Sequence, residues 1–189
     1  IPWESEQTLI ENKLEAKQNR RSLVLTPFEK NLSKGQYTFD HLKDFATGKL
    51  SDALGKEFEP LNSLGSFRMP NSELMLCSRV NWIKGKPKSF DKCEIEAEFD
   101  FPNDAWFYGE NPHLGENATP MFVIQEAALQ PCGFISMWLG SHLICLDDKL
   151  AKSQSMLFRN LDAKAHVVDN IDVKGKTITC WAKLTKHNK

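Results

Sequence analysis

The sequence predicts an α+β fold in which an antiparallel sheet wraps around one long buried helix. Residues 93–101 (CEIEAEFDF) alternate apolar and acidic side chains, the period of a strand with one buried and one solvated face. Residues 121–140 (MFVIQEAALQPCGFISMWLG) are apolar on nearly every side, which indicates a helix covered by the sheet rather than lying on its surface. Pro131 is expected to kink this helix or break one turn.

The first 26 residues are predicted to form a linker or an N-terminal extension. Residues 4–20 are polar with three apolar anchors, which indicates a weak helix, and Thr26-Pro27 marks the boundary. Residues 27–189 are then predicted to form one folded domain. Position 1 is not Met, so we expect a piece excised from a longer chain.

The remaining elements follow from periodicity and turn residues. Residues 38–48 hold apolar side chains at helical spacing, with Thr38 as N-cap candidate and Gly48 as the stop. Residues 55–73 are predicted to be a loop. Strands are predicted at 74–83, 93–101, 156–168 and 177–185, with KGKPK (84–88) as the turn between the first two. A sheet of this kind around one long helix is the hotdog architecture.

Composition and charge exclude several classes of function. The formal net charge of −1 argues against a nucleic-acid-binding protein. Polar residues and Pro131 interrupt the apolar segment, so no membrane span is expected. Five cysteines without a C-x-x-C pair suit free thiols in a reducing cytoplasm and no structural zinc. Residues 147–189 hold 9 Lys+Arg against 5 Asp+Glu, either a docking face for an acidic partner or a solvated surface.

Glu126 is the one formal charge between residues 121 and 146. A carboxylate inside an apolar helix must be paired, protonated or functional, because burying an unpaired charge costs several kcal/mol. Burial favours the neutral form, as a general acid requires, whereas the dipole of the nearby helix start favours the charged form; we expect burial to dominate. The alternatives are a hydrogen bond to Gln130 one turn later, or a place at a dimer seam.

His113 lies in a loop rich in Gly, Asn and Pro that leads into the long helix. This position suits a general base whose substrate oxygen faces the helix amides, although a His in a loop is often simply a surface residue. Cys132 is expected to pack as a small apolar side chain rather than act as a nucleophile. The sequence holds none of the common phosphate-loop, nucleophile-elbow or zinc motifs, so no metal or nucleotide is expected.

Residues 37 to 185 resemble the bacterial 3-hydroxydecanoyl-acyl carrier protein dehydratase/isomerase family. They look closest to the dehydratase domains of polyunsaturated fatty acid and related polyketide synthases. The short run ALQPCG, after Glu126, is the most specific match. The matching segments, in order, are YTFDHLKDFATGKL, RMPNSELMLCSRV, IEAEFDFPNDAWFY, His113, TPMFVIQEAALQPCGF and the late strand pair.

The resemblance implies a hotdog fold with a composite site. In the family, a His from one hotdog faces an Asp or Glu on the central helix of its partner, across a homodimer or double-hotdog seam. Carried over, His113 is the base, Glu126 the acid, and the backbone amide of Met121 the donor to the thioester carbonyl. The offset from Glu126 to Gln130 also matches the family helix and places Gln130 behind the acid.

The function implied is dehydration of 3-hydroxyacyl thioesters on an acyl carrier protein to trans-2-enoyl thioesters, with isomerisation undecided, in fatty acid or polyketide synthesis. The substrate arrives on the carrier's phosphopantetheine arm, so no other cofactor is expected. The spacing of 13 from His113 to Glu126 is one residue shorter than usual, and Met121 and Phe122 replace small residues. These departures leave two alternatives open: a non-catalytic half of a double hotdog, or a hotdog thioesterase.

Overall fold

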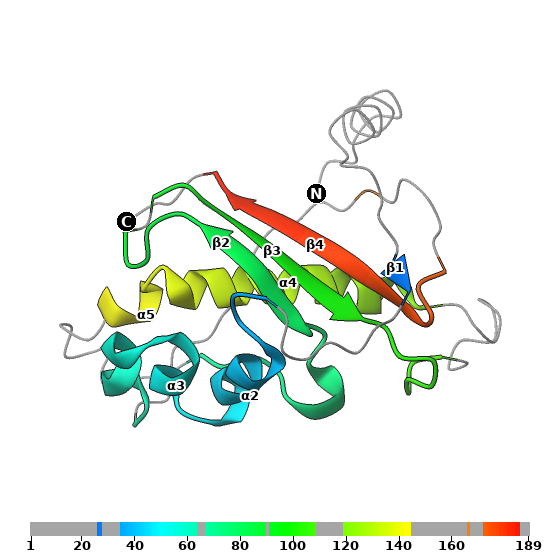
Figure 1. Ribbon diagram of the computed structural model, residues 1–189, viewed down its shortest axis with the longest axis horizontal. Helices are drawn as coiled ribbons and strands as arrows, with labels where there is room; N and C mark the ends of the chain where they lie inside the picture. Colours follow the sequence, from blue (N-terminus) through cyan, green and yellow to red (C-terminus); the bar gives the residue numbers. More distant parts are fainter. Residues whose placement is uncertain are drawn as a thin grey trace, which may run out of the picture.

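The structure, a computed structural model, describes residues 26–27, 35–63, 67–89, 91–108, 119–144, 166 and 172–185. Four antiparallel strands form one sheet in the order β1-β4-β3-β2. Figure 1 shows the long helix α4 (Met121–Trp138) crossing behind the sheet, with the short helices grouped beside it. The prediction of an α+β fold with an antiparallel sheet is confirmed. The strands are β1 (Thr26–Pro27), β2 (Arg79–Lys84), β3 (Cys93–Asp100) and β4 (Lys176–Leu184).

The hairpin β2–β3 and the pair β3–β4 form the body of the sheet. Along β3, Cys93, Ile95 and Ala97 are buried while Glu94 and the following Glu residues are partly exposed, as the alternation predicts. The prediction fails at the end of the strand, where Asp100 is also buried. The strand predicted at 74–83 begins later, at Arg79, because residues Ser72–Leu74 form a 3₁₀ turn, η2.

Helix α2 (Phe39–Thr47) forms where the apolar spacing predicted it. It buries Leu42, Phe45 and Ala46, and the N–H of Thr38 donates to Nδ1 of His41 at 3.1 Å, which satisfies a donor at the helix start. It stops at Gly48, whose N–H donates to the carbonyl of Asp44. Helix α3 (Leu50–Leu54) follows, and the predicted loop contains a further 3₁₀ turn, η1 (Lys56–Leu61).

Helix α4 continues through Pro131 to Trp138, and the short α5 (Ser141–Ile144) follows it. Pro131 is buried inside α4, and it cannot donate the hydrogen bond that the carbonyl of Ala127 would otherwise receive. Gly133 is needed by packing, because a Cβ there would lie 2.8 Å from Cζ of Phe67. The helix predicted at 4–20 lies outside the described residues, and so does the strand predicted at 156–168 apart from residue 166.

Two hydrophobic clusters divide the core between the two halves of α4. The first cluster joins the second half of α4, together with Leu139 directly after it, to α2 and α3 and to buried side chains of β2 and β3, among them Val80 and Ile95. The second joins Val123 and Ala127, in the first half, to residues at the far end of the sheet, among them Phe99 and Ile178. The first half of α4 is therefore anchored separately from the second, at the end of the sheet where β3 stops.

Candidate functional site

Glu126 lies in the first half of α4 and is exposed. Val123 and Ala127 point into the core, each about 1% exposed, so the opposite side of the helix carries Phe122, Gln125 and Glu126 toward solvent. The prediction that the helix buries this carboxylate is therefore wrong for the single chain. The physical reason is that the sheet covers one side of this half only, and apolar composition does not reveal which side is left open.

Gln130, one turn after Glu126, holds the carboxylate in place. The Nε2 amide of Gln130 donates to Oε1 of Glu126 at 3.2 Å and to the carbonyl of Leu74 at 2.8 Å. Its Oε1 accepts the N–H of Leu76 at 2.8 Å. Gln130 is itself only 6% exposed. The hydrogen bond between Glu126 and Gln130, which the sequence offered as the alternative to a catalytic role for Glu126, is thus present. Gln130 is fixed from behind by the segment that leads into β2.

The start of α4 lies open, about one turn before the carboxylate. The residue before the helix is Pro120, and no side chain in the described part of the chain caps this end. The first N–H groups of a helix lack an acceptor four residues earlier in the same helix, and the helix dipole favours negative charge there. Met121 is 44% and Phe122 61% exposed, so this helix end is accessible. It suits the role predicted for the Met121 amide, donation to a substrate oxygen.

His113 lies outside the described residues, so its distance to Glu126 is untested and its role stays a prediction. Two other histidines are placed. His41 bonds to Thr38 at the start of α2. His142 is buried on α5, its Nδ1 has no hydrogen-bond partner among the described residues, and burial lowers its pKa. No described contact joins either of these two histidines to Glu126.

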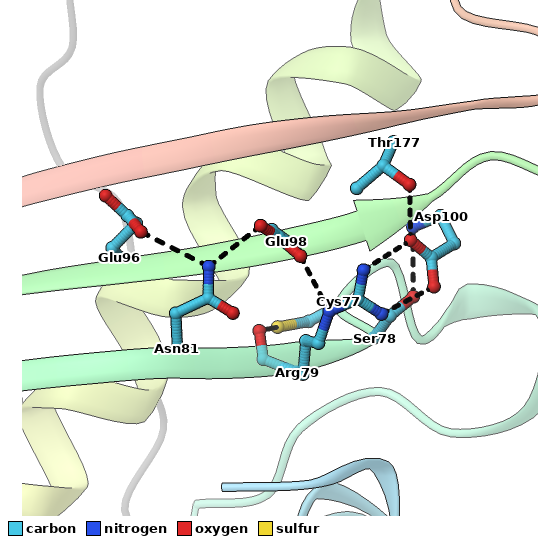
Figure 2. Close-up of polar contacts among 8 residues, drawn as sticks. All are labelled: Cys77, Ser78, Arg79, Asn81, Glu96, Glu98, Asp100 and Thr177. Atoms are coloured by element: carbon cyan, nitrogen blue, oxygen red, sulfur yellow. Dashed lines mark hydrogen bonds and ion pairs between the residues drawn. The ribbon is translucent and has the colours of Figure 1, made fainter. Parts of the chain in front are cut away.

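The buried network around Arg79 was not predicted from the sequence. Arg79 donates from both terminal nitrogens to Asp100, at 2.6 and 2.8 Å, and from Nε to Glu98 at 2.6 Å. Thr177 donates to Asp100 and Asn81 donates to Glu98, so the network joins β2, β3 and β4 (Figure 2). Burial lowers the pKa of Arg79, but its hydrogen bonds and charge interactions with Asp100 and Glu98 outweigh that effect and raise it.

This network explains why Asp100 departs from the alternation of β3. Both terminal nitrogens of Arg79 and the hydroxyl of Thr177 bind its carboxylate, so burial leaves no unpaired charge. The only sequence signal is an Arg on one strand opposite Glu and Asp on the next, and that signal requires the register of the hairpin to be known.

A pocket of about 410 Å³ lies at the same end of the sheet, between η2 and the residues that follow β3. Leu76 lines this pocket and also supplies the N–H that binds Gln130. No pattern in the sequence predicts the pocket, because its walls come from segments that are far apart along the chain and that only the fold brings together.

The described thiols are unsuited to nucleophilic catalysis, as predicted for Cys132. Burial raises the pKa of Cys77 and of Cys180 to about 12, which keeps both protonated at neutral pH. Burial also raises the pKa of Cys132. Within the described ranges, no group of three or more His, Cys, Asp and Glu side chains is arranged to hold a metal ion. No described helix is both long and apolar enough to cross a membrane.

Comparison with known proteins relates the chain to a fatty acid synthase. No family model matches it. The chain is 32% identical to a subunit of the polyunsaturated fatty acid synthase of Thraustochytrium sp., over an alignment of 187 residues that covers 89% of this chain. It spans only 12% of the length of that relative. The chain is therefore similar to one segment of a much larger protein. This agrees with the resemblance to polyunsaturated fatty acid synthases, but it does not identify which activity the segment has.

Proposed function

We propose that this chain is a hotdog dehydratase domain that converts 3-hydroxyacyl thioesters on an acyl carrier protein into trans-2-enoyl thioesters, in fatty acid or polyketide synthesis. One observation carries the proposal: an exposed carboxylate, Glu126, on the helix that the sheet covers, held by the buried Gln130. The similarity to part of a polyunsaturated fatty acid synthase and the ordered sequence motifs support the same assignment.

The contacts of Glu126 differ from those of the buried Asp100. A buried carboxylate is normally paired with a cation, as Asp100 is with Arg79, whereas Glu126 is exposed. Among the described residues, the hydrogen-bond partner of the Glu126 side chain is the neutral amide of Gln130. Gln130 is immobilised by Leu74 and Leu76, so the carboxyl group is oriented without being neutralised.

The proposed reaction needs two proton transfers. Neutral His113 removes the proton on the carbon next to the thioester carbonyl, and the resulting negative charge on the carbonyl oxygen is stabilised by the amide of Met121 and the helix dipole. Protonated Glu126 gives its proton to the hydroxyl group, which leaves as water while the double bond forms. One such amide donor contributes roughly 3 kcal/mol in other enzymes.

The site is completed by a second hotdog. Met121, Phe122 and Glu126 are exposed on the side of α4 that the sheet does not cover. A partner that covers this side would exclude water and bring its own catalytic His, His113 in a second copy, to Glu126. The partner is a second copy or a neighbouring domain of a larger synthase. The proposed chemistry uses only protein groups and the carrier's phosphopantetheine arm. The four described cysteines are free, which suits a reducing cytoplasm.

The proposal is tested with 3-hydroxyacyl thioesters of several chain lengths on acyl carrier protein, with products followed by mass spectrometry. We expect the wild type to form the enoyl thioester. His113→Ala and Glu126→Gln should each lose about 10²- to 10⁴-fold in rate while staying folded. Glu59→Gln, which removes an exposed carboxylate on η1, is the control and should keep the wild-type rate.

Three results would contradict the proposal. Release of free acid would indicate a thioesterase. A folded wild type that is inert on every chain length would indicate a non-catalytic half of a double hotdog. Full activity in Glu126→Gln would remove Glu126 from the chemistry, whatever the reaction is.

A further inference from the structure

The pocket between η2 and the residues after β3 combines aromatic walls with acidic groups. Its volume of about 410 Å³ lies within the range of small-molecule sites. Four of its lining residues are aromatic and three are acidic, and no Lys or Arg is found among the described residues that line it. Its acidic and aromatic lining is different from the surroundings of Glu126, where the neutral amide of Gln130 holds a single carboxylate.

Two of the three carboxylates in the pocket have no counter-charge among the described residues. Asp100 is bound on both oxygens by Arg79, so its charge is already paired. Glu73 and Asp104 are exposed, and neither side chain forms an ion pair or hydrogen bond with any residue in the described part of the chain. The rim of the pocket therefore carries two negative charges that face solvent without a counter-charge from those residues.

The aromatic wall is held in place and also lacks a cation. Trp106 contacts Phe107 edge to face with ring centroids 5.5 Å apart, and its indole N–H donates to the carbonyl of Glu73 at 3.3 Å. Lys84 lies over the ring of Trp82 and Lys174 over that of Tyr108, and neither ring lines the pocket. Within the described residues, no cation lies over the rings that do line it.

We propose that this pocket binds a small organic cation with an apolar body, such as an alkylammonium group. Aromatic faces attract cations through their quadrupole, and nearby carboxylates add Coulomb attraction. Phe99, Met75 and Leu76 supply the apolar surface for the body of the ligand. An anionic ligand is disfavoured by Glu73 and Asp104, and a neutral one gains nothing from them.

The test uses three probes of one chain length: hexylammonium, hexanol and hexanoate. Each is titrated into the full chain while the indole N–H signal of Trp106 is followed by ¹H–¹⁵N NMR, with Trp106→Phe to assign that signal. We expect saturable binding of hexylammonium, at least tenfold tighter than that of hexanol, and no binding of hexanoate. Raising the salt concentration should weaken the binding, because exposed charges are screened.

Substitutions of the two free carboxylates sharpen the test. Glu73→Gln and Asp104→Asn should each weaken hexylammonium binding about threefold, as expected for exposed ion pairs. Glu59→Gln and Asp91→Asn remove exposed carboxylates outside the pocket and should leave the affinity unchanged. The probes are compared on the wild type, so a folding failure of Glu73→Gln or Asp104→Asn does not decide the outcome.

The proposal is overturned if hexanol binds as tightly as hexylammonium, which would indicate a site for neutral apolar chains. It is also overturned if hexanoate binds, if no probe shifts the Trp106 signal, or if the control substitutions weaken binding as much as Glu73→Gln and Asp104→Asn.

Discussion

The two halves of α4 are similarly apolar in sequence but differ in their surroundings. In the second half, Phe134 is fully buried and packs edge to face against Tyr37 and Phe45, and the residues up to Leu139 are almost all buried. In the first half, Phe122 is 61% exposed and Glu126 is also exposed. An apolar helix can therefore combine a core segment with an open segment, and the open segment is where we place the chemistry.

The largest effect that separates the halves is on stability. Phe134→Ala should lower the free energy of unfolding by about 3–5 kcal/mol, because it removes a fully buried ring from the first cluster. Phe122→Ala, the matched substitution in the exposed segment, should change it by less than about 0.5 kcal/mol. Urea unfolding of both variants, at a concentration where the chain is monomeric, measures the difference. Equal losses would show that both segments belong to one core.

A smaller effect is expected at the junction of the halves. Gln130→Leu leaves the N–H of Leu76 and the carbonyl of Leu74 without their partner, at a cost of about 2 kcal/mol. It also releases Glu126, so the dehydration rate should fall by more than the loss of folded protein explains. Glu59→Leu, at an exposed position on η1, is the control for unfolding measurements and rate assays. A Gln130→Leu variant with normal stability and rate would contradict the role assigned to this amide.

The smallest effect concerns pH. Burial lowers the pKa of His142 below its usual value of about 6.5. At a pH between the lowered pKa and about 6.5, His142 is therefore protonated in the unfolded chain but not in the folded chain. The free energy of unfolding should therefore fall as the pH drops below about 6.5, and His142→Phe should flatten this slope. Unfolding curves recorded between pH 5 and 8 measure how the free energy of unfolding depends on pH. The control variant is His41→Gln, which replaces a half-buried His at the start of α2. A steeper slope in His142→Phe would contradict the assignment.

Local patterns predicted the elements that depend on local sequence. The caps of α2 at Thr38 and Gly48, the alternation of β3 up to Glu98 and the extent of α4 all follow from spacing and residue type. The contact between Glu126 and Gln130 was also predictable, because residues four apart on a helix are neighbours.

The features that were missed depend on contacts between distant segments. Asp100 is buried only because Arg79 and Thr177 reach it from other strands. The exposure of Glu126 depends on where the sheet ends over α4, which apolar composition does not encode. Gln130 was placed behind the acid, but its bonds to Leu74 and Leu76 require the path of the segment before β2.

In the proposed function, the exposed half of α4 supplies Glu126 to a site whose His113 comes from a second hotdog. The most direct test mixes two inactive variants, His113→Ala and Glu126→Gln, after unfolding and refolding them together. If the site is shared, a mixed dimer holds one intact pair, and about a quarter of the wild-type activity should return, since half of the dimers are mixed and each has one working site. If the mixture stays inactive while the wild type turns over as a dimer, both residues act within one chain, and the account is wrong.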